Sequence, residues 1–219
     1  MNSKTILIGA VAIAALGIIA YKFIPASYMG GMSDMDHSTM MTDDVSPAAK
    51  GYQTAMAGMM KAMMVAPTGK PDLDFIQGMI PHHQGAIDMA RVVLQYGKDP
   101  EVKTFAENVV KAQEGEITSM NAWLAKTDKA ALPTSAEAAL GNSNAMAAMM
   151  KDMMVPYSGD ADVDFIKGMI PHHQGAIDAS KVGLKYAKDA DVLKLAQDIT
   201  TAQESEITFM KEWLKKNGK

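Results

Sequence analysis

The sequence predicts an all-α protein in which one helical unit occurs twice behind an N-terminal apolar segment. Apolar residues recur every three to four positions, and no window shows the alternating pattern of a strand. Capping residues followed by proline mark two helix starts. A paired-histidine motif at His82 recurs at His172, an offset of 90 residues (172 − 82), together with its flanking sequence. We therefore expect long helices joined by short loops in a bundle.

Residues 1–24 contain an apolar stretch that is typical of an export signal. Between Lys4 and Lys22 the chain is uncharged and mostly apolar, and as a helix this stretch would be about 26 Å long. That length is at the lower limit for a membrane span and slightly long for the apolar region of a signal peptide. No good small-x-small cleavage motif follows. We expect an uncleaved signal anchor, with a cleaved signal peptide as the alternative, and a periplasmic or other extracytoplasmic body.

Residues 25–45 are rich in Gly, Ser and Asp and predict a flexible linker. A solvated linker has no core for large apolar side chains, yet this one holds five methionines around one histidine. Thioether and imidazole groups are ligands for soft metals, Cu(I) above all. We therefore expect metal ligands in the linker, namely Met29, Met32, Met35, His37, Met40 and Met41.

The internal repeat divides the rest of the chain into two helical bundle repeats, residues 46–128 and 129–219. Residues 55–124 align without a gap with the sequence 90 positions later, and more than half of the aligned positions are identical. A unit of this length is a domain or half-domain rather than a solenoid repeat. The length allows two separate compact units of about 80 residues or one bundle made of two halves.

Each repeat is expected to form three helices. In the first repeat, the first helix begins with Ser46 as its N-cap and ends before Pro67. The second helix extends over about residues 72–96, and the third begins after Asp99. Pro81 interrupts the second helix, so either the helix kinks there or a new helix begins. We favour the kink, because the apolar stripe stays in phase on both sides.

Methionines occupy five successive positions of the apolar stripe of the first helix. This spacing is typical of core packing at any single position, but a core of defined shape would use Leu or Ile. Both repeats fill the stripe only with Met, which indicates a polarizable sulfur face. We call these residues the methionine stripe: Met56, Met59, Met60, Met63 and Met64, and in the second repeat Met146, Met149, Met150, Met153 and Met154.

Polar residues lie on or beside stripes that should be apolar. A buried charge or imidazole without a partner costs several kcal/mol, so these groups must meet one another, water or a metal. On the second helix a methionine precedes the histidine pair by three and four residues, and on the third a glutamate precedes a methionine by four. Together with the stripe residues Met59, Met60, Met63, Met64, Met149, Met150, Met153 and Met154, the candidate ligands of the two repeats are Met79, His82, His83, Glu116, Met120, Met169, His172, His173, Glu206 and Met210.

Composition excludes several classes of protein. The formal net charge is −4 and no basic block occurs, so nucleic acid is not an expected partner. Cysteine is absent, which rules out disulfides and thiolate metal sites within the chain. Methionine accounts for 21 of 219 residues, far above its ordinary share.

Residues 74–90, with the core Met-Ile-Pro-His-His, and residues 113–124 resemble the "domain of unknown function 305" family. The second repeat matches equally well, apart from Ala179 where the first repeat has Met89. This family is ferritin-like in fold and includes periplasmic copper-binding proteins of the CopM type. The resemblance implies two tandem copies of a small, exported, ferritin-like bundle that binds Cu(I) through methionine and histidine, with Ag(I) as a second candidate ion.

We expect a non-enzymatic protein that captures or buffers Cu(I) for copper homeostasis or resistance, with Ag(I) and Cu(II) as further candidate ions. A thioether binds metal without losing a proton, whereas a histidine ligand loses affinity as it protonates. Expected partners are copper ions, the membrane through the N-terminal helix, and a copper exporter or other copper-handling protein.

Two alternatives belong to other classes. Met-rich faces could form an adaptable groove for another protein, with no metal involved. A di-iron or di-manganese carboxylate oxidase would suit a helical bundle, but its Glu-x-x-His pairs occur nowhere in the sequence. Heme binding by His and Met would lack the Cys-x-x-Cys-His attachment motif, because the chain has no cysteine.

Overall fold

The computed structural model describes residues 46–219, which fold into helices without any strand in that range. The expected signal anchor, the linker and the six linker ligands lie outside the described residues. Among residues 46–219, none of the helices combines the length and the hydrophobicity that a membrane span requires. The described helices are α3 (Pro47–Met63), α4 (Pro71–Tyr96), α5 (Pro100–Lys126), α6 (Ala136–Asp152), α7 (Ala161–Tyr186) and α8 (Ala190–Lys216).

The helix starts follow from local capping chemistry. Ser46 is the N-cap of α3, and its hydroxyl accepts a hydrogen bond from the Ala49 backbone N–H at 3.2 Å. Asp99 caps α5 by accepting from the N–H groups of Glu101 and Val102. Both predicted starts are confirmed. Asp189 caps α8 in the same way, so the two repeats use the same device.

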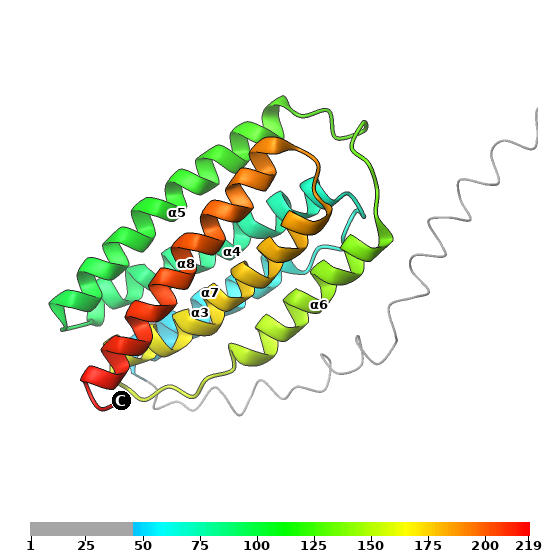
Figure 1. Cartoon of the computed structure of the whole chain (residues 1–219). Coiled ribbons are helices and arrows are strands. Elements are labelled where there is room, and N and C mark those ends of the chain that lie inside the picture. Colours follow the sequence, from blue (N-terminus) through cyan, green and yellow to red (C-terminus); the bar gives the residue numbers. More distant parts are fainter. Residues whose placement is uncertain (1–45) are drawn as a thin grey trace, which may run out of the picture. The chain divides into compact units, whose positions relative to one another are not determined.

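The six helices form an all-α, ferritin-like bundle around a central antiparallel pair, α4 and α7. Figure 1 shows α5 and α8 on one side of this pair and α3 and α6 on the other. Helices α7 and α8 begin and end 90 positions after α4 and α5. All described residues belong to one compact unit. Of the two arrangements that the repeat allowed, the observed one is therefore a single bundle made of two halves.

Helix α4 continues without a break from residue 71 to 96, with Pro81 inside it. The alternative in which Pro81 begins a new helix is therefore not observed. A proline in a helix removes one backbone hydrogen bond. Here the apolar face on both sides of Pro81 is buried, and that burial outweighs the loss of a single bond.

Two buried aspartates tie the halves together at the ends of the central pair. The Asp72 carboxylate, at the start of α4, accepts from the backbone N–H groups of Lys188 and Asp189 at 3.0 and 2.9 Å. Reciprocally, Asp162 at the start of α7 accepts from the N–H groups of Lys98 and Asp99 at 2.8 and 3.2 Å. Each half therefore satisfies the backbone donors that precede the last helix of the other half.

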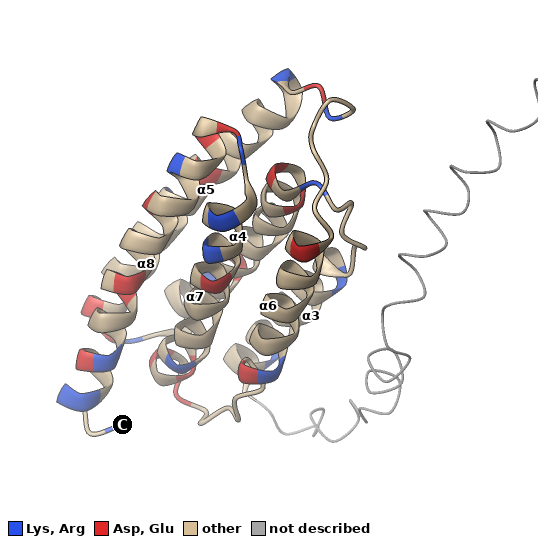
Figure 2. Cartoon of the chain, turned by 45° about the vertical axis from the view of Figure 1, so that its right-hand side comes forward, with Lys and Arg blue, Asp and Glu red and all other residues tan. Residues whose placement is uncertain are grey.

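Charged residues are unevenly distributed over the bundle. Figure 2 shows Lys, Arg, Asp and Glu along α5 and α8 and near the helix ends, whereas the middle parts of α3 and α6 are largely uncharged. Ion pairs such as Lys126 with Asp191 and Lys216 with Glu101 link α5 and α8 across the charged side. These pairs are exposed, so each contributes little to stability. The α3 and α6 side therefore presents a mostly neutral surface.

We predict that Asp72→Ala lowers the free energy of unfolding by about 1–2 kcal/mol, because two backbone N–H groups lose a charged acceptor. Urea denaturation followed by circular dichroism measures the change. The matched control is Asp88→Ala on the same helix, where the carboxylate pairs only with nearby surface side chains and the expected change is below about 0.5 kcal/mol. Equal losses in the two variants would show that the link between the halves is not stabilising.

Candidate metal centre

Four histidines meet where α4 crosses α7 in the middle of the bundle. All four are buried, with at most 3% of each residue exposed. The His82 and His172 rings face each other with centroids 3.8 Å apart and an interplanar angle of 44°. His83 and His173 flank this pair, with ring centroids 6.1 and 6.0 Å from those of their chain neighbours. The two histidine pairs, 90 residues apart in sequence, therefore form one cluster.

The outer two histidines are each held by a glutamate. His83 Nε2 lies 2.5 Å from Glu116 Oε2, and His173 Nε2 lies 2.6 Å from Glu206 Oε2. An Nε2–H that donates to a carboxylate leaves the Nδ1 lone pair available. Neither Nδ1 has a hydrogen-bond partner among the described residues. A histidine ligand that donates its other N–H to a carboxylate is a common arrangement in metal sites.

In this arrangement Glu116 and Glu206 orient imidazoles. The sequence pattern predicts both as direct ligands, together with Met120 and Met210 one turn further along. The glutamate side chains are only partly exposed and each contacts its histidine. Their position fits an orienting role better than a direct one.

The inner two histidines differ from each other. His172 Nε2 lies 3.0 Å from the backbone carbonyl oxygen of His82 and can donate to it. Both ring nitrogens of His82 are buried without a hydrogen-bond partner in the described part of the chain. A neutral imidazole carries one N–H, and leaving that donor unsatisfied costs about 1–3 kcal/mol. The buried N–H calls for an acceptor such as a water molecule, and the lone pair of the other ring nitrogen is free to bind a cation.

Burial keeps the inner pair neutral. Desolvation lowers the pKa of His82 and of His172 well below the ordinary value of 6.5, and the neighbouring imidazoles lower it further. A neutral imidazole retains the lone pair that a metal needs. The crossing therefore holds unprotonated donors at pH values where a solvated histidine is partly protonated.

Buried methionines lie beside the histidine-bearing part of each central helix. Met59 lies against Gly85 on α4, one helical turn from His82, so closely that a Cβ on Gly85 would be 2.6 Å from the Met59 sulfur. Met149 lies against Gly175 on α7 in the same way. Glycine at these two positions makes room for a thioether next to the histidine face. Four further predicted ligands are buried on the central and outer helices: Met79, Met120, Met169 and Met210.

The methionine stripe is not uniformly buried. Met59, Met149 and Met153 are buried, whereas the predicted ligands Met64 and Met154 are exposed beyond the ends of α3 and α6. The intermediate positions are partly buried, namely Met56, Met60, Met63, Met146 and Met150. The stripe therefore faces the core at some positions and the surface at others.

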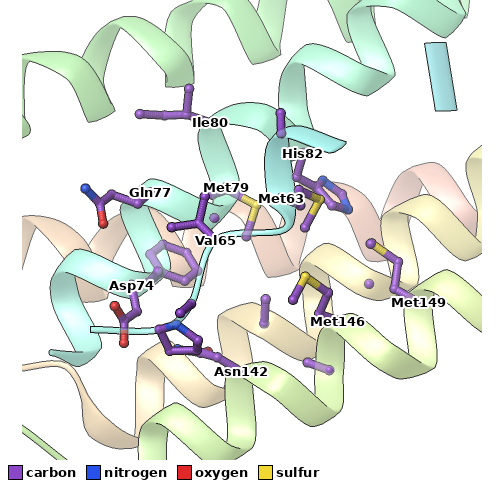
Figure 3. A pocket seen from close by; sticks show the side chains of 18 residues that line it. Met63, Val65, Asp74, Gln77, Met79, Ile80, His82, Asn142, Met146 and Met149 are labelled. Carbon is purple, nitrogen blue, oxygen red and sulfur yellow. The ribbon is translucent and has the colours of Figure 1, made fainter. Parts of the chain in front are cut away.

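A cavity of about 320 Å³ reaches His82 from the α3 and α6 side. We call it the His82 cavity. Figure 3 shows the Met79 and Met63 side chains next to the His82 ring, with Met146 and Met149 pointing toward them from α6. Met146 is not among the ligands predicted from the sequence, although its place in the methionine stripe was the available signal.

The carboxylate arrangement of a di-iron oxidase is not present in the described part of the chain. Between residues 46 and 219, no three or more His, Asp or Glu side chains converge as a metal-binding group. Glu116 and Glu206 each approach a different histidine instead. The donors that lie side by side at the crossing are the paired His82 and His172 rings, with thioethers next to them, and both donor types suit soft metals.

Residues 72–214 match the family described as "Domain of unknown function (DUF305)". A curated relative from Acanthamoeba polyphaga mimivirus, described as uncharacterized, is 40% identical over 53 residues. That match covers 24% of this chain and 35% of the relative, so the chain spans about a third of the relative's length.

Solved structures of the same fold include CopM with different metals. The silver-bound form is 32% identical, and the match covers 69% of this chain and 98% of CopM with a TM-score of 0.52. The Cu(I)-bound form is 34% identical, with coverage of 66% and 96% and a TM-score of 0.52. A candidate secreted DUF305 protein from Streptomyces coelicolor is 28% identical, with coverage of 69% and 95% and a TM-score of 0.55.

We predict that acid destabilises the metal-free bundle through His82 and His172. Their pKa values are lowered in the folded state, so the unfolded chain binds more protons as the pH falls below about 6.5. The free energy of unfolding should then fall by up to about 1.4 kcal/mol per pH unit for each histidine, and should not change above that pH through these two groups. Urea denaturation between pH 5 and pH 8 measures the slope.

The imidazole ¹⁵N shifts provide a check that does not depend on a variant. At pH values near 5, the His82 and His172 rings should still give the shifts of neutral imidazole. Full protonation of both rings in the folded protein at that pH would contradict the prediction.

Proposed function

We propose a copper-handling role for this chain, which belongs to the DUF305 family. In this proposal its bundle captures and buffers Cu(I) through neutral histidine and methionine donors, with Ag(I) as a second ion. The observation that carries the proposal is the cluster of four buried imidazoles with unpartnered nitrogens beside buried thioethers. We propose capture rather than catalysis as its role.

The donor set favours a soft ion of single charge. Thioethers and neutral imidazoles carry no charge, and the glutamates at the crossing each contact a histidine. Burying an ion costs more as its charge rises, and neutral donors do not cancel that charge. Cu(I) and Ag(I) therefore suit this set better than divalent ions, while imidazoles nearer the glutamates could also accept Cu(II).

The relatives support copper as the cargo. CopM, which shares the fold at about one-third identity, has been solved with Ag, with Cu(II) and with Cu(I) bound. We extend that property to this chain because its own histidines and methionines supply suitable donors. The candidate secreted relative supports a place outside the cytoplasm. In an oxidising compartment a thiolate site would be prone to oxidation, whereas a thioether site contains no thiol.

The N-terminal segment fits the same role. In this proposal residues 1–24 anchor or export the protein, and the linker methionines with His37 collect copper and pass it to the bundle. A copper exporter or another copper-handling protein would supply or receive the ion. Such a chain would serve copper homeostasis or resistance.

A metal-free interaction protein is the second candidate. Exposed apolar side chains favour it, in particular Met64 and Val65 beyond the end of α3, and Leu140 and Met154 on or just after α6. Metal analysis of the protein purified from copper-supplemented cells separates the two functions. Copper that co-purifies and is lost when the four bundle histidines are replaced supports capture.

We predict that replacing His82, His83, His172 and His173 by Asn weakens Cu(I) binding by the bundle at least about tenfold. The full chain is purified in detergent and titrated anaerobically with Cu(I) against a chromophoric chelator. Linker binding is removed in all samples by one set of substitutions: Met29, Met32, Met35, Met40 and Met41 to Gln, and His37 to Asn.

The control for this titration replaces Gln84 and Gln174 by Ala. These residues follow the histidine pairs directly but are exposed on the helix surface. Their variant should bind Cu(I) as the parent does. A histidine variant that remains helical and binds Cu(I) with unchanged affinity would overturn the proposed function.

A further inference from the structure

The two halves of the bundle are built alike but do not pack alike. The His82 cavity lies between the end of α3, the first half of α4, α6 and the part of α7 around Gly175. Each residue that lines this cavity has a counterpart 90 positions away in the other half. These counterparts lie at the end of α6, in the first half of α7, in α3 and in the part of α4 around Gly85. Larger side chains lie among these counterparts, so we call that side the closed side and the side of the His82 cavity the open side.

The first difference is at the pair Met89 and Ala179. On the closed side, the Met89 methyl group lies against α7, so that a Cβ on Gly168 would be 2.9 Å from it. On the open side the corresponding residues are Ala179 and Gly78, and a Cβ on Gly78 would meet nothing within 4 Å. The loss of one methionine side chain therefore leaves space at one end of the His82 cavity.

Two further differences widen the same side. On the closed side Tyr52 and Tyr157 stack with ring centroids 6.2 Å apart, and the Tyr52 hydroxyl donates to the Ala161 carbonyl at 2.8 Å. The residues 90 positions from these tyrosines are Asn142 and Pro67, and both line the His82 cavity. Three large side chains on one side thus correspond to three smaller ones on the other.

The inner histidines share this asymmetry. His172, on the closed side, has a hydrogen-bond partner in the His82 carbonyl. His82, on the open side, lines the cavity and has no partner for either nitrogen among the described residues. The unsatisfied imidazole and the open space therefore coincide.

The lining of the His82 cavity is almost entirely neutral. The lining residues that suit a soft metal are His82 and the four thioethers of Met63, Met79, Met146 and Met149, and the side-chain amides of Gln77 and Asn142 are uncharged. The one carboxylate in the lining, Asp74, already accepts from the backbone N–H groups of Thr68 and Gly69 at 2.7 and 2.9 Å. The cavity also borders the exposed residue Val65, which gives it a way to solvent.

We infer that the two halves are unequal metal sites: the His82 cavity takes one soft monovalent cation, Cu(I) or Ag(I), and the closed side around His172 takes none. The inference rests on the proposed function for the kind of ion, but the inequality of the halves follows from the packing. Ala179, Asn142 and Pro67 make the difference, because they leave open the volume that Met89, Tyr52 and Tyr157 fill. The repeat therefore provides one cavity, although it duplicates the ligands.

Silver titration of the full chain tests the inference without redox chemistry. The chain carries ¹³C-methyl methionine and the linker substitutions given above, and Ag(I) is added in steps while methyl signals are followed by NMR. The signals of Met63, Met79, Met146 and Met149 should shift first. Their counterparts, Met153, Met169, Met56 and Met59, serve as internal controls and should not shift in the same range of added silver.

The matched variant is Ala179→Met, which places on the open side the residue that the closed side already has. It should abolish the early shifts of the cavity methionines and remove a single bound Ag(I). Ala179→Ser keeps the cavity open and should bind silver like the parent. Thermal unfolding of both variants checks that each remains folded.

The possible outcomes distinguish a failure of the inequality between the halves from a failure of the proposed function. Methionine signals of both halves that shift together at the same silver ratio would overturn the inequality but leave the proposed function standing. Silver binding by folded Ala179→Met that equals binding by the parent would also overturn the inequality. If silver shifts no bundle methionine at all, the proposed function fails and the inference fails with it.

Discussion

The antiparallel crossing of α4 and α7 is the constraint on which the rest of the bundle depends. Four imidazoles are buried there, and a buried imidazole needs either a partner or a neutral state. Two of them have glutamates from α5 and α8, so those helices must lie where the carboxylates reach the crossing. At the ends of the central pair, Asp72 and Asp162 fix the register by accepting from the loops of the opposite half. The shorter helices α3 and α6 pack on the faces of α4 and α7 that α5 and α8 do not cover.

Local chemistry made much of this structure predictable. The helical period, the capping residues Ser46 and Asp99, and the 90-residue repeat predicted the helix class and helix starts correctly. These signals involve residues close in sequence, or a comparison of the chain with itself. The continuity of α4 through Pro81 was also favoured, because the apolar stripe does not change phase at the proline.

Contacts between the halves could not be predicted in this way. The pairing of His82 with His172 depends on which faces of α4 and α7 meet, and periodicity identifies a buried face without identifying its partner. Glu116 was recognised as a polar residue at the core, but its role toward His83 depends on the distance between two helices. The His82 cavity was harder still to predict from the sequence. The exchange of Met89 for Ala179 was visible in the sequence, but it gained meaning only when Gly168 and Gly78 were found opposite these residues.

The reciprocal ties between the halves have a consequence for how such a bundle can be encoded. A half on its own lacks the aspartate that satisfies the loop before its last helix, so a chain with one copy would complete the bundle by pairing with a second, identical chain. In a homodimer of that kind, symmetry requires two cavities or none. Fusion of two copies into one polypeptide removes that requirement. The crossing must still suit both halves, but the flanking residues of each copy are free to diverge, and a single asymmetric opening becomes available only to the fused chain.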